Sequence, residues 1–190
     1  MLYKPASLGV AALVIAASAA VAQAPQAAEV GPKVGDVAPD FSLTGATKDG
    51  VMPTKISLSK LKGQTVVIAF FPKARTTGCT AQMTHYRDKY AELFNSGKGV
   101  TVIGVSADAD TTLANWAKEA GFPMLFASDI LGEMGKLYGA YSEKAKVENR
   151  LLFVVGPDGR IAYTVKPFKP MVEDSYTDLG AAVKKISGAK

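Results

Sequence analysis

Apolar residues occur along this chain in short runs that are separated by polar, glycine-containing segments. Two runs, residues 65–71 and 100–105, are almost continuously apolar and rich in β-branched side chains, which predicts strands buried on both faces. Between them, residues 79–94 carry apolar side chains at helical spacing and end at Asn95-Ser96-Gly97, a typical helix stop. The pattern therefore predicts a strand, a helix and a second strand in succession.

The remaining pattern extends this alternation. Three further helices and a short strand are predicted, namely helices over residues 111–120, 132–138 and 175–186 and a strand over 124–126. Asp108 or Asp110 is expected to cap the first of these helices. Two apolar runs, 151–155 and 161–165, flank a turn rich in glycine and proline, which indicates a hairpin. Earlier in the chain, residues 37–43 are interpreted as an edge element, residues 45–52 as a loop and residues 57–63 as a helical turn. The sequence thus predicts an α/β domain whose mixed central sheet has helices on both faces.

The N-terminal residues have the features of a secretory signal. Lys4 supplies a positive charge, residues 8–17 are almost wholly apolar, and Ala20-Val21-Ala22 fits a signal-peptidase site. We therefore interpret residues 1–22 as a signal peptide, 23–33 as a flexible leader and 34–190 as one domain. This assignment predicts export, with the bacterial periplasm as the expected destination and no stable membrane span after cleavage. An uncleaved membrane anchor is the alternative, although the apolar run is short for a span of about 20 residues.

Composition excludes several classes of function. The formal net charge is +5, and removal of Lys4 with the signal lowers it by one. No block of like charge is present, so nucleic-acid binding is not expected. The carboxylates are scattered without metal-ligand spacing, and we predict neither a metal nor a cofactor. Cys79 is the only cysteine, which excludes both an internal disulfide and a Cys-x-x-Cys redox pair.

Cys79 nevertheless stands in the sequence setting of a reactive thiol. The apolar stretch before it ends at Pro72, a polar turn containing Gly78 follows, and the cysteine begins the helical pattern. A sulfur at a helix N-terminus lies among unpaired N–H groups and the positive end of the helix dipole. Both favour the thiolate, which is the nucleophilic form, and Lys73 and Arg75 add positive charge nearby.

These residues resemble a known family. Pro72-x-x-x-Thr76-x-x-Cys79 matches the signature of the peroxiredoxins, most closely that of the bacterioferritin-comigratory or Q-type branch. Further agreements follow in family order: the opening at Gly35, Ala38, Pro39 and Phe41, the run Tyr86-Arg87-Asp88, the strand end Gly104-Val105-Ser106, and Arg150-x-x-Phe153 before a hairpin. The resemblance covers about residues 33–165.

The resemblance implies a thioredoxin-like fold and a thiol-dependent peroxidase that reduces hydrogen peroxide or organic hydroperoxides. Cys79 would attack the peroxide and become a sulfenic acid. The Thr76 hydroxyl and the Cys79 N–H would hold the peroxide oxygens, Arg150 would fold over the thiolate, and Pro72 would shield the sulfur. The implied partners are a peroxide and an external thiol reductant, either a thioredoxin-like protein or a small thiol, and the chain would be a monomer or homodimer.

Two departures from the Q-type pattern change the expected mechanism. Many members carry a second cysteine five residues after the first, where this chain has Thr84, so no cysteine within the chain can resolve the sulfenic acid. Leu152 and Gly156 replace the usual Thr and Asp, which affects the expected peroxide preference more than the reaction. We therefore expect a one-cysteine mechanism, with reduction by an outside thiol or cross-linking of two chains through Cys79.

Other interpretations remain open at this point. A thiol-disulfide oxidoreductase of the exported cytochrome-maturation type resembles the opening of the domain, but here Thr76 stands in place of the first cysteine of its pair. A non-enzymatic peroxide sensor would use the same pocket. Each candidate residue also has a purely structural interpretation: a buried apolar thiol for Cys79, a helix cap for Thr76, a surface ion pair for Arg150, a strand end for Pro72, and a packing or surface role for His85.

Overall fold

A computed structural model of the chain describes Met1 and residues 30–188. The predicted signal peptide after Met1, and the leader up to residue 29, lie outside the described residues. The strands are β1 (Ser42–Thr47), β2 (Gly50–Val51), β3 (Ile56–Ser57), β4 (Thr65–Phe70), β5 (Val100–Ser106), β6 (Leu125–Ser128), β7 (Tyr141–Ser142), β8 (Val147–Glu148), β9 (Leu152–Val155) and β10 (Ile161–Val165). The helices are α1 (Thr77–Asp88), α2 (Tyr90–Phe94), α3 (Asp110–Ala120), α4 (Glu133–Tyr138) and α5 (Glu173–Ser187), with 3-10 turns η1 (Leu58–Leu61) and η2 (Asn95–Gly97).

The central sheet is mixed, as the sequence predicts. Its order is β10-β9-β4-β5-β6-β1-β2, with β3 pairing to β1, and β7 and β8 form a separate small hairpin. Strands β4, β5 and β6 are parallel, whereas β9 runs antiparallel to β4 and β1 antiparallel to β6. Because β4 and β5 lie in the middle and are buried on both faces, their runs are apolar without alternation.

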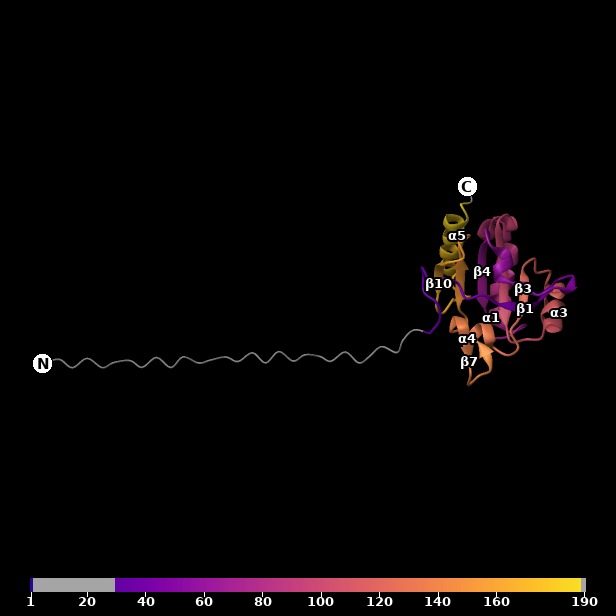
Figure 1. The fold of residues 1–190 in the computed structure, drawn as a ribbon, viewed down its shortest axis with the longest axis horizontal. Helices are drawn as coiled ribbons and strands as arrows, with labels where there is room; N and C mark the ends of the chain where they lie inside the picture. The colour runs from indigo at the N-terminus through magenta and orange to yellow at the C-terminus, as the bar shows by residue number, and fades with distance from the viewer. Residues whose placement is uncertain (2–29, 189–190) are drawn as a thin grey trace.

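Helices cover both faces of the sheet, and each face has its own apolar core. Alternate residues of β4 divide between them: Val67 and Ala69 face the core formed with α1, α2, α3 and α5, while Ile68 and Phe70 face the core that includes α4. In Figure 1, α5 lies at one end of the domain, and α4 with β7 lies at the other. This is the mixed α/β arrangement expected from the sequence.

Several predicted boundaries are wrong. Residues 45–52 are not a loop but hold the second half of β1 and all of β2, whose small residues hide the strand pattern. Their size has a packing reason, since a Cβ on Gly45 would lie 2.7 Å from both Ile56 and the Met52 sulfur. Residues 37–43 contribute only an isolated bridge between Val37 and Arg160 and the first residues of β1.

The predicted helix over residues 79–94 is two helices. It begins earlier, at Thr77, and breaks at Lys89, whose φ and ψ are −108° and 20°. The break turns α2 so that Leu93 packs closely on Gly180 of α5. The expected caps of α3 are also wrong, because Ala109 is the cap residue and Asp108 bonds elsewhere. The small hairpin of β7 and β8 is absent from the prediction.

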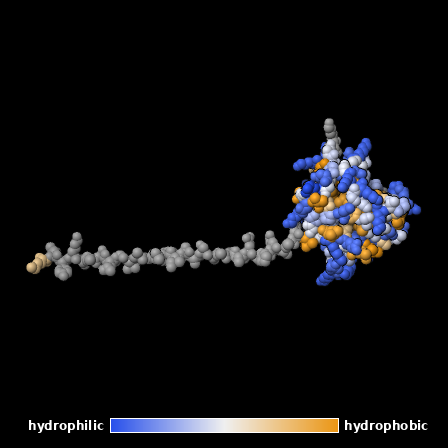
Figure 2. Space-filling model, in the orientation of Figure 1, coloured by the Kyte–Doolittle hydropathy of each residue, from blue (hydrophilic) through white to orange (hydrophobic). Residues whose placement is uncertain are grey.

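Hydrophilic and hydrophobic residues are interspersed on the face shown in Figure 2. Of the helices formed by residues 30–188, none is both long and apolar enough to cross a bilayer.

Candidate active site

The sheet brings Cys79 and Arg150 together across a separation of about seventy residues. Cys79 lies in the first turn of α1, which follows the carboxyl end of β4, and Arg150 precedes β9. Since β9 runs antiparallel to β4, the start of β9 lies beside the end of β4, and the Phe70 N–H donates to the Leu151 carbonyl at 2.9 Å. Strand pairing therefore places Arg150 next to the helix that carries the thiol.

The guanidinium of Arg150 contacts the sulfur directly. Its Nη2 lies 3.2 Å from Cys79 Sγ, and Cys79 is fully buried whereas Arg150 is half-buried. The first hydrogen bond of α1 runs from the Thr80 N–H to the Thr76 carbonyl. The N–H groups of residues 77–79, which include that of Cys79, therefore have no carbonyl partner within the helix. The sulfur thus has a cationic donor beside it and is itself shielded from water, which strengthens the charge interaction between them.

The turn before the helix holds the other two predicted site residues. The Thr76 hydroxyl donates to the Lys73 carbonyl at 2.9 Å, which leaves its oxygen lone pairs free to accept, and Thr76 makes no side-chain cap to the helix. Pro72 is half-buried at the start of this turn. Arg75 has a left-handed backbone, with φ of 66°, and its guanidinium turns outward to Glu119 at 2.7 Å. Arg75 is therefore a surface ion-pair residue.

Asp108, which the sequence suggested as a helix cap, instead anchors this turn. Its Oδ2 accepts from the Ala74 N–H at 2.7 Å and from the Ser106 hydroxyl at 2.9 Å. The loop after β5 and the loop after β4 lie side by side because β4 and β5 are parallel neighbours. A carboxylate on one loop can therefore fix the backbone of the other.

Gln82 is a further site residue that the sequence interpretation missed. Its Oε1 accepts from Arg150 Nη1 at 2.6 Å, and its Nε2 donates to the Tyr86 hydroxyl at 3.0 Å. Gln82 and Tyr86 are both fully buried. The spacing could have indicated this role. Gln82 and Tyr86 follow Cys79 by three and seven positions, so on a helix their side chains lie on the same face as the thiol.

His85 lies away from the thiol, as its helical position predicts. Its ring stacks on Tyr176 of α5 with centroids 3.7 Å apart, and its Nε2 lies 3.8 Å from a carboxylate oxygen of Glu173. It is therefore a packing residue between α1 and α5.

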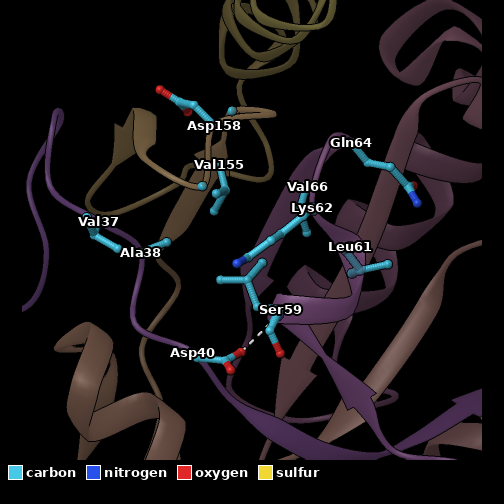
Figure 3. Close-up of a pocket in the computed structure, with 13 residues that line it drawn as sticks. Val37, Ala38, Asp40, Ser59, Leu61, Lys62, Gln64, Val66, Val155 and Asp158 are labelled. Carbon is cyan, nitrogen blue, oxygen red and sulfur yellow. Dashed lines mark hydrogen bonds between the residues drawn. The ribbon is translucent and has the colours of Figure 1, made fainter.

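A pocket of about 290 Å³ lies at the opposite end of the sheet from Cys79 (Figure 3). It is bounded by the start of β4 near Val66, the end of β9 near Val155, and residues 37–40. Asp40 at its edge accepts from the backbone of Ser59 at 3.0 Å. Burial opposes ionisation of this carboxyl, but the N–H groups around it outweigh burial and keep the pKa of Asp40 below its usual value. None of the predicted site residues lines this pocket.

Metal binding has no support in the described part of the chain. Among residues 30–188, no three His, Cys, Asp or Glu side chains are grouped closely enough to hold an ion. The polar groups around Cys79 are donors and neutral amides rather than metal ligands.

Comparisons with known proteins agree with this geometry. The profile of the AhpC/TSA family matches residues 34–164. The chain belongs to this family. It is 33% identical over 143 residues to the peroxiredoxin Bcp of Escherichia coli, covering 72% of this chain and 87% of that protein. This peroxiredoxin is thus of the Q or Bcp type, with a single cysteine.

Solved structures place the fold in the same family. Peroxidoxin BcpB from Mycobacterium tuberculosis superposes with a TM-score of 0.67 at 27% identity, covering 82% of this chain and 98% of that one. AhpC from Enterococcus faecalis gives a TM-score of 0.70 at 18% identity, covering 81% of this chain and 92% of that one. The peroxiredoxin therefore has a thioredoxin-like fold and is a thiol-dependent peroxidase, as the resemblance implied.

Proposed function

We propose that this peroxiredoxin reduces peroxides through Cys79, with Arg150 stabilising the charge at the reacting atoms, Thr76 binding the peroxide and Pro72 shielding the sulfur. The contact of 3.2 Å between Arg150 Nη2 and Cys79 Sγ carries this proposal. A guanidinium beside the buried sulfur favours the thiolate before reaction and stabilises the oxyanion that leaves during it. The Thr76 hydroxyl, whose proton is already donated to Lys73, would accept from the peroxide O–H.

The reaction is a two-electron transfer from sulfur to peroxide. The thiolate of Cys79 attacks the terminal oxygen of ROOH, so that an S–O bond forms as the O–O bond breaks. The products are Cys79 sulfenic acid and an alkoxide or hydroxide, which takes a proton to become an alcohol or water. The sulfur is oxidised and the peroxide reduced.

Regeneration requires a thiol from outside the chain, because Cys79 is the only cysteine. One external thiol attacks the sulfenic sulfur, which forms a mixed disulfide and releases water. A second thiol then attacks that disulfide, which restores Cys79 and leaves the reductant oxidised. A monothiol or a dithiol protein satisfies this balance equally, and reaction of the sulfenic acid with Cys79 of another chain would give a cross-linked homodimer instead.

Peroxide consumption with excess dithiothreitol tests the proposal. Cys79→Ser should abolish consumption, whereas Thr84→Ser on the same helix should leave it unchanged. Intact mass after one equivalent of peroxide should show the gain of one oxygen, and a doubled mass would indicate the cross-linked dimer. Consumption by Cys79→Ser at the parental rate would refute the proposal.

The same assay separates the alternatives. A thiol-disulfide oxidoreductase would reduce insulin, which a chain without a Cys-x-x-Cys pair should not do. A peroxide sensor would form the sulfenic acid quickly but turn over negligibly with any reductant.

We also propose that the chain is exported to the bacterial periplasm after cleavage behind Ala22. The charged start, the apolar run and the small residues of the first 22 positions support this proposal. Recovery of a periplasmic protein that begins at Gln23 is the expected result. A membrane-bound protein that retains its N-terminus would show instead that the segment is an anchor.

A further inference from the structure

Arg150 is held at the sulfur by a relay that ends at Tyr86. The guanidinium donates from Nη1 to Gln82 Oε1 at 2.6 Å, and Gln82 Nε2 donates to the Tyr86 hydroxyl at 3.0 Å. Both side chains of the relay are fully buried. The relay therefore lies where a missing hydrogen-bond partner is costly.

The Tyr86 hydroxyl holds the Gln82 amide in the orientation that Arg150 requires. A guanidinium has only donors, so Arg150 requires the carbonyl oxygen of the amide and is repelled by its NH₂ group. The two ends of the amide have nearly the same shape, and packing alone distinguishes them weakly. Arg150 itself therefore sets the direction of the amide. The Tyr86 oxygen accepts from the NH₂ group at the far end, so both ends of the buried amide have a partner and the amide is held in place.

Tyr86 also contacts the segment that holds the backbone of Arg150. Its ring packs edge-on against Phe168 and Tyr176, with centroids 6.2 and 5.9 Å apart. The Phe168 N–H donates to the Arg150 carbonyl at 2.8 Å, and the Tyr176 hydroxyl donates to the Pro170 carbonyl at 2.7 Å. Tyr86 thus touches both supports of Arg150, one at the side chain and one at the backbone.

The charge state of Tyr86 suits this role. Complete burial raises the pKa of the phenol far above its usual value, so the hydroxyl is un-ionised at neutral pH. It therefore anchors the amide without adding a negative charge that would compete for the guanidinium.

We propose that Tyr86 is a positioning residue of this peroxiredoxin, which acts through Gln82 to hold the Arg150 guanidinium against Cys79. The proposal rests on the role assigned above to Arg150. Tyr86 touches neither substrate nor sulfur, and its effect should disappear when Arg150 is absent.

A double-mutant cycle tests this dependence. The rate at which Cys79 gains oxygen from hydrogen peroxide is measured by rapid quench and intact mass, for the parent, Tyr86→Phe, Arg150→Met and the double variant. Tyr86→Phe keeps the ring and its packing. In the parent background, Tyr86→Phe should lower the rate of Cys79 oxidation about tenfold, which corresponds to one misplaced hydrogen bond. In the Arg150→Met background, it should change that rate by less than about twofold.

Two further variants keep the test decisive. Tyr138→Phe is the matched control, because it removes another buried hydroxyl, which donates to the Pro39 carbonyl at 2.8 Å, from the opposite core. Its rate should equal that of the parent. Gln82→Met breaks the relay at its other member. It should lower the oxidation rate at least as much as Tyr86→Phe does, and this effect should disappear when Arg150 is replaced by Met.

The outcomes separate this inference from the proposed mechanism. Equal slowing by Tyr86→Phe with and without Arg150 would mean a general structural effect and would overturn the positioning role. An unchanged rate in Tyr86→Phe or in Gln82→Met, beside a slow Arg150→Met, would overturn the relay while preserving the role of Arg150. An unchanged rate in Arg150→Met would refute the proposed mechanism itself.

Discussion

Glu148 makes the stability of the fold depend on pH through a buried pair of carboxyl groups. The residue lies on β8 and is fully buried, and its carboxyl oxygens lie against the backbone of Gly135 in α4. Burial and the neighbouring Asp129 carboxylate raise the pKa of Glu148 to about 8. Asp129 itself accepts from the Gly135 N–H at 2.7 Å. Neither carboxyl oxygen of Glu148 has a hydrogen-bond partner in the structure, so burial first and the Asp129 charge second favour the neutral, protonated form.

The sign and size of the effect follow from proton linkage. In the unfolded chain Glu148 titrates near its ordinary pKa of 4.5, so between pH 4.5 and about 8 the folded state binds a proton that the unfolded state has released. The free energy of unfolding therefore falls by about 1.4 kcal/mol for each pH unit in this window. The stabilisation is fully present below pH 4.5 and is lost by about pH 8. Between pH 5 and 7 the loss from this one group is about 3 kcal/mol.

Urea unfolding of the parent, Glu148→Gln and Glu133→Gln measures this contribution. Glutamine is neutral throughout and can donate its amide N–H to Asp129. The stability of Glu148→Gln relative to the parent should therefore rise by about 3 kcal/mol between pH 5 and 7. Glu133 is an exposed carboxylate on α4, and its variant should keep the parental pH slope. Parallel curves for the parent and Glu148→Gln across this range would show that the pKa of Glu148 is not raised in the folded protein.

Two further predictions concern the site. Arg150→Met should slow oxidation of Cys79, measured by rapid quench, by at least about a hundredfold, since it removes a charged donor beside the reacting sulfur. The control is Arg160→Met. Its guanidinium is exposed and donates to the Gly35 carbonyl, so its loss should leave the rate unchanged. Asp108→Ala should lower the free energy of unfolding by about 1–3 kcal/mol, because the Ala74 N–H loses its acceptor, and should also slow the peroxide reaction. Urea titration measures the first effect and the rapid-quench assay the second. Parental values in both would contradict the anchoring role of Asp108.

The sequence predicted the strands at the centre of the sheet because burial on both faces leaves a long apolar signal. Strands β1 and β2, on one side of the sheet, were missed for the converse reason. Apart from Leu43, β1 consists of small and polar residues, and its need for Gly45 comes from contacts with Ile56 and Met52 that are made only in the folded chain. The break at Lys89 likewise depends on how α2 meets α5, which no local pattern encodes.

The same distinction applies to the site. Cys79 was recognisable from its local setting, and Arg150 from the order of family motifs. Gln82 and Asp108 were not, because their roles depend on partners that the fold brings to them, an arginine from the start of β9 and a backbone N–H from the loop after β4. Thr76 also differs from a simple cap, since its hydroxyl bonds back to Lys73 rather than to the helix.

The use of a neutral amide at position 82 has an electrostatic consequence for the sulfur. Gln82 fixes the direction of the Arg150 guanidinium through Nη1, while Nη2 faces Cys79 Sγ. A carboxylate in the same place would hold the guanidinium more tightly but would also offset its positive charge within a few ångströms of the sulfur, where burial leaves little screening. The amide separates the two tasks, because it orients the cation and leaves its charge to the thiolate and to the oxyanion that forms when the O–O bond breaks.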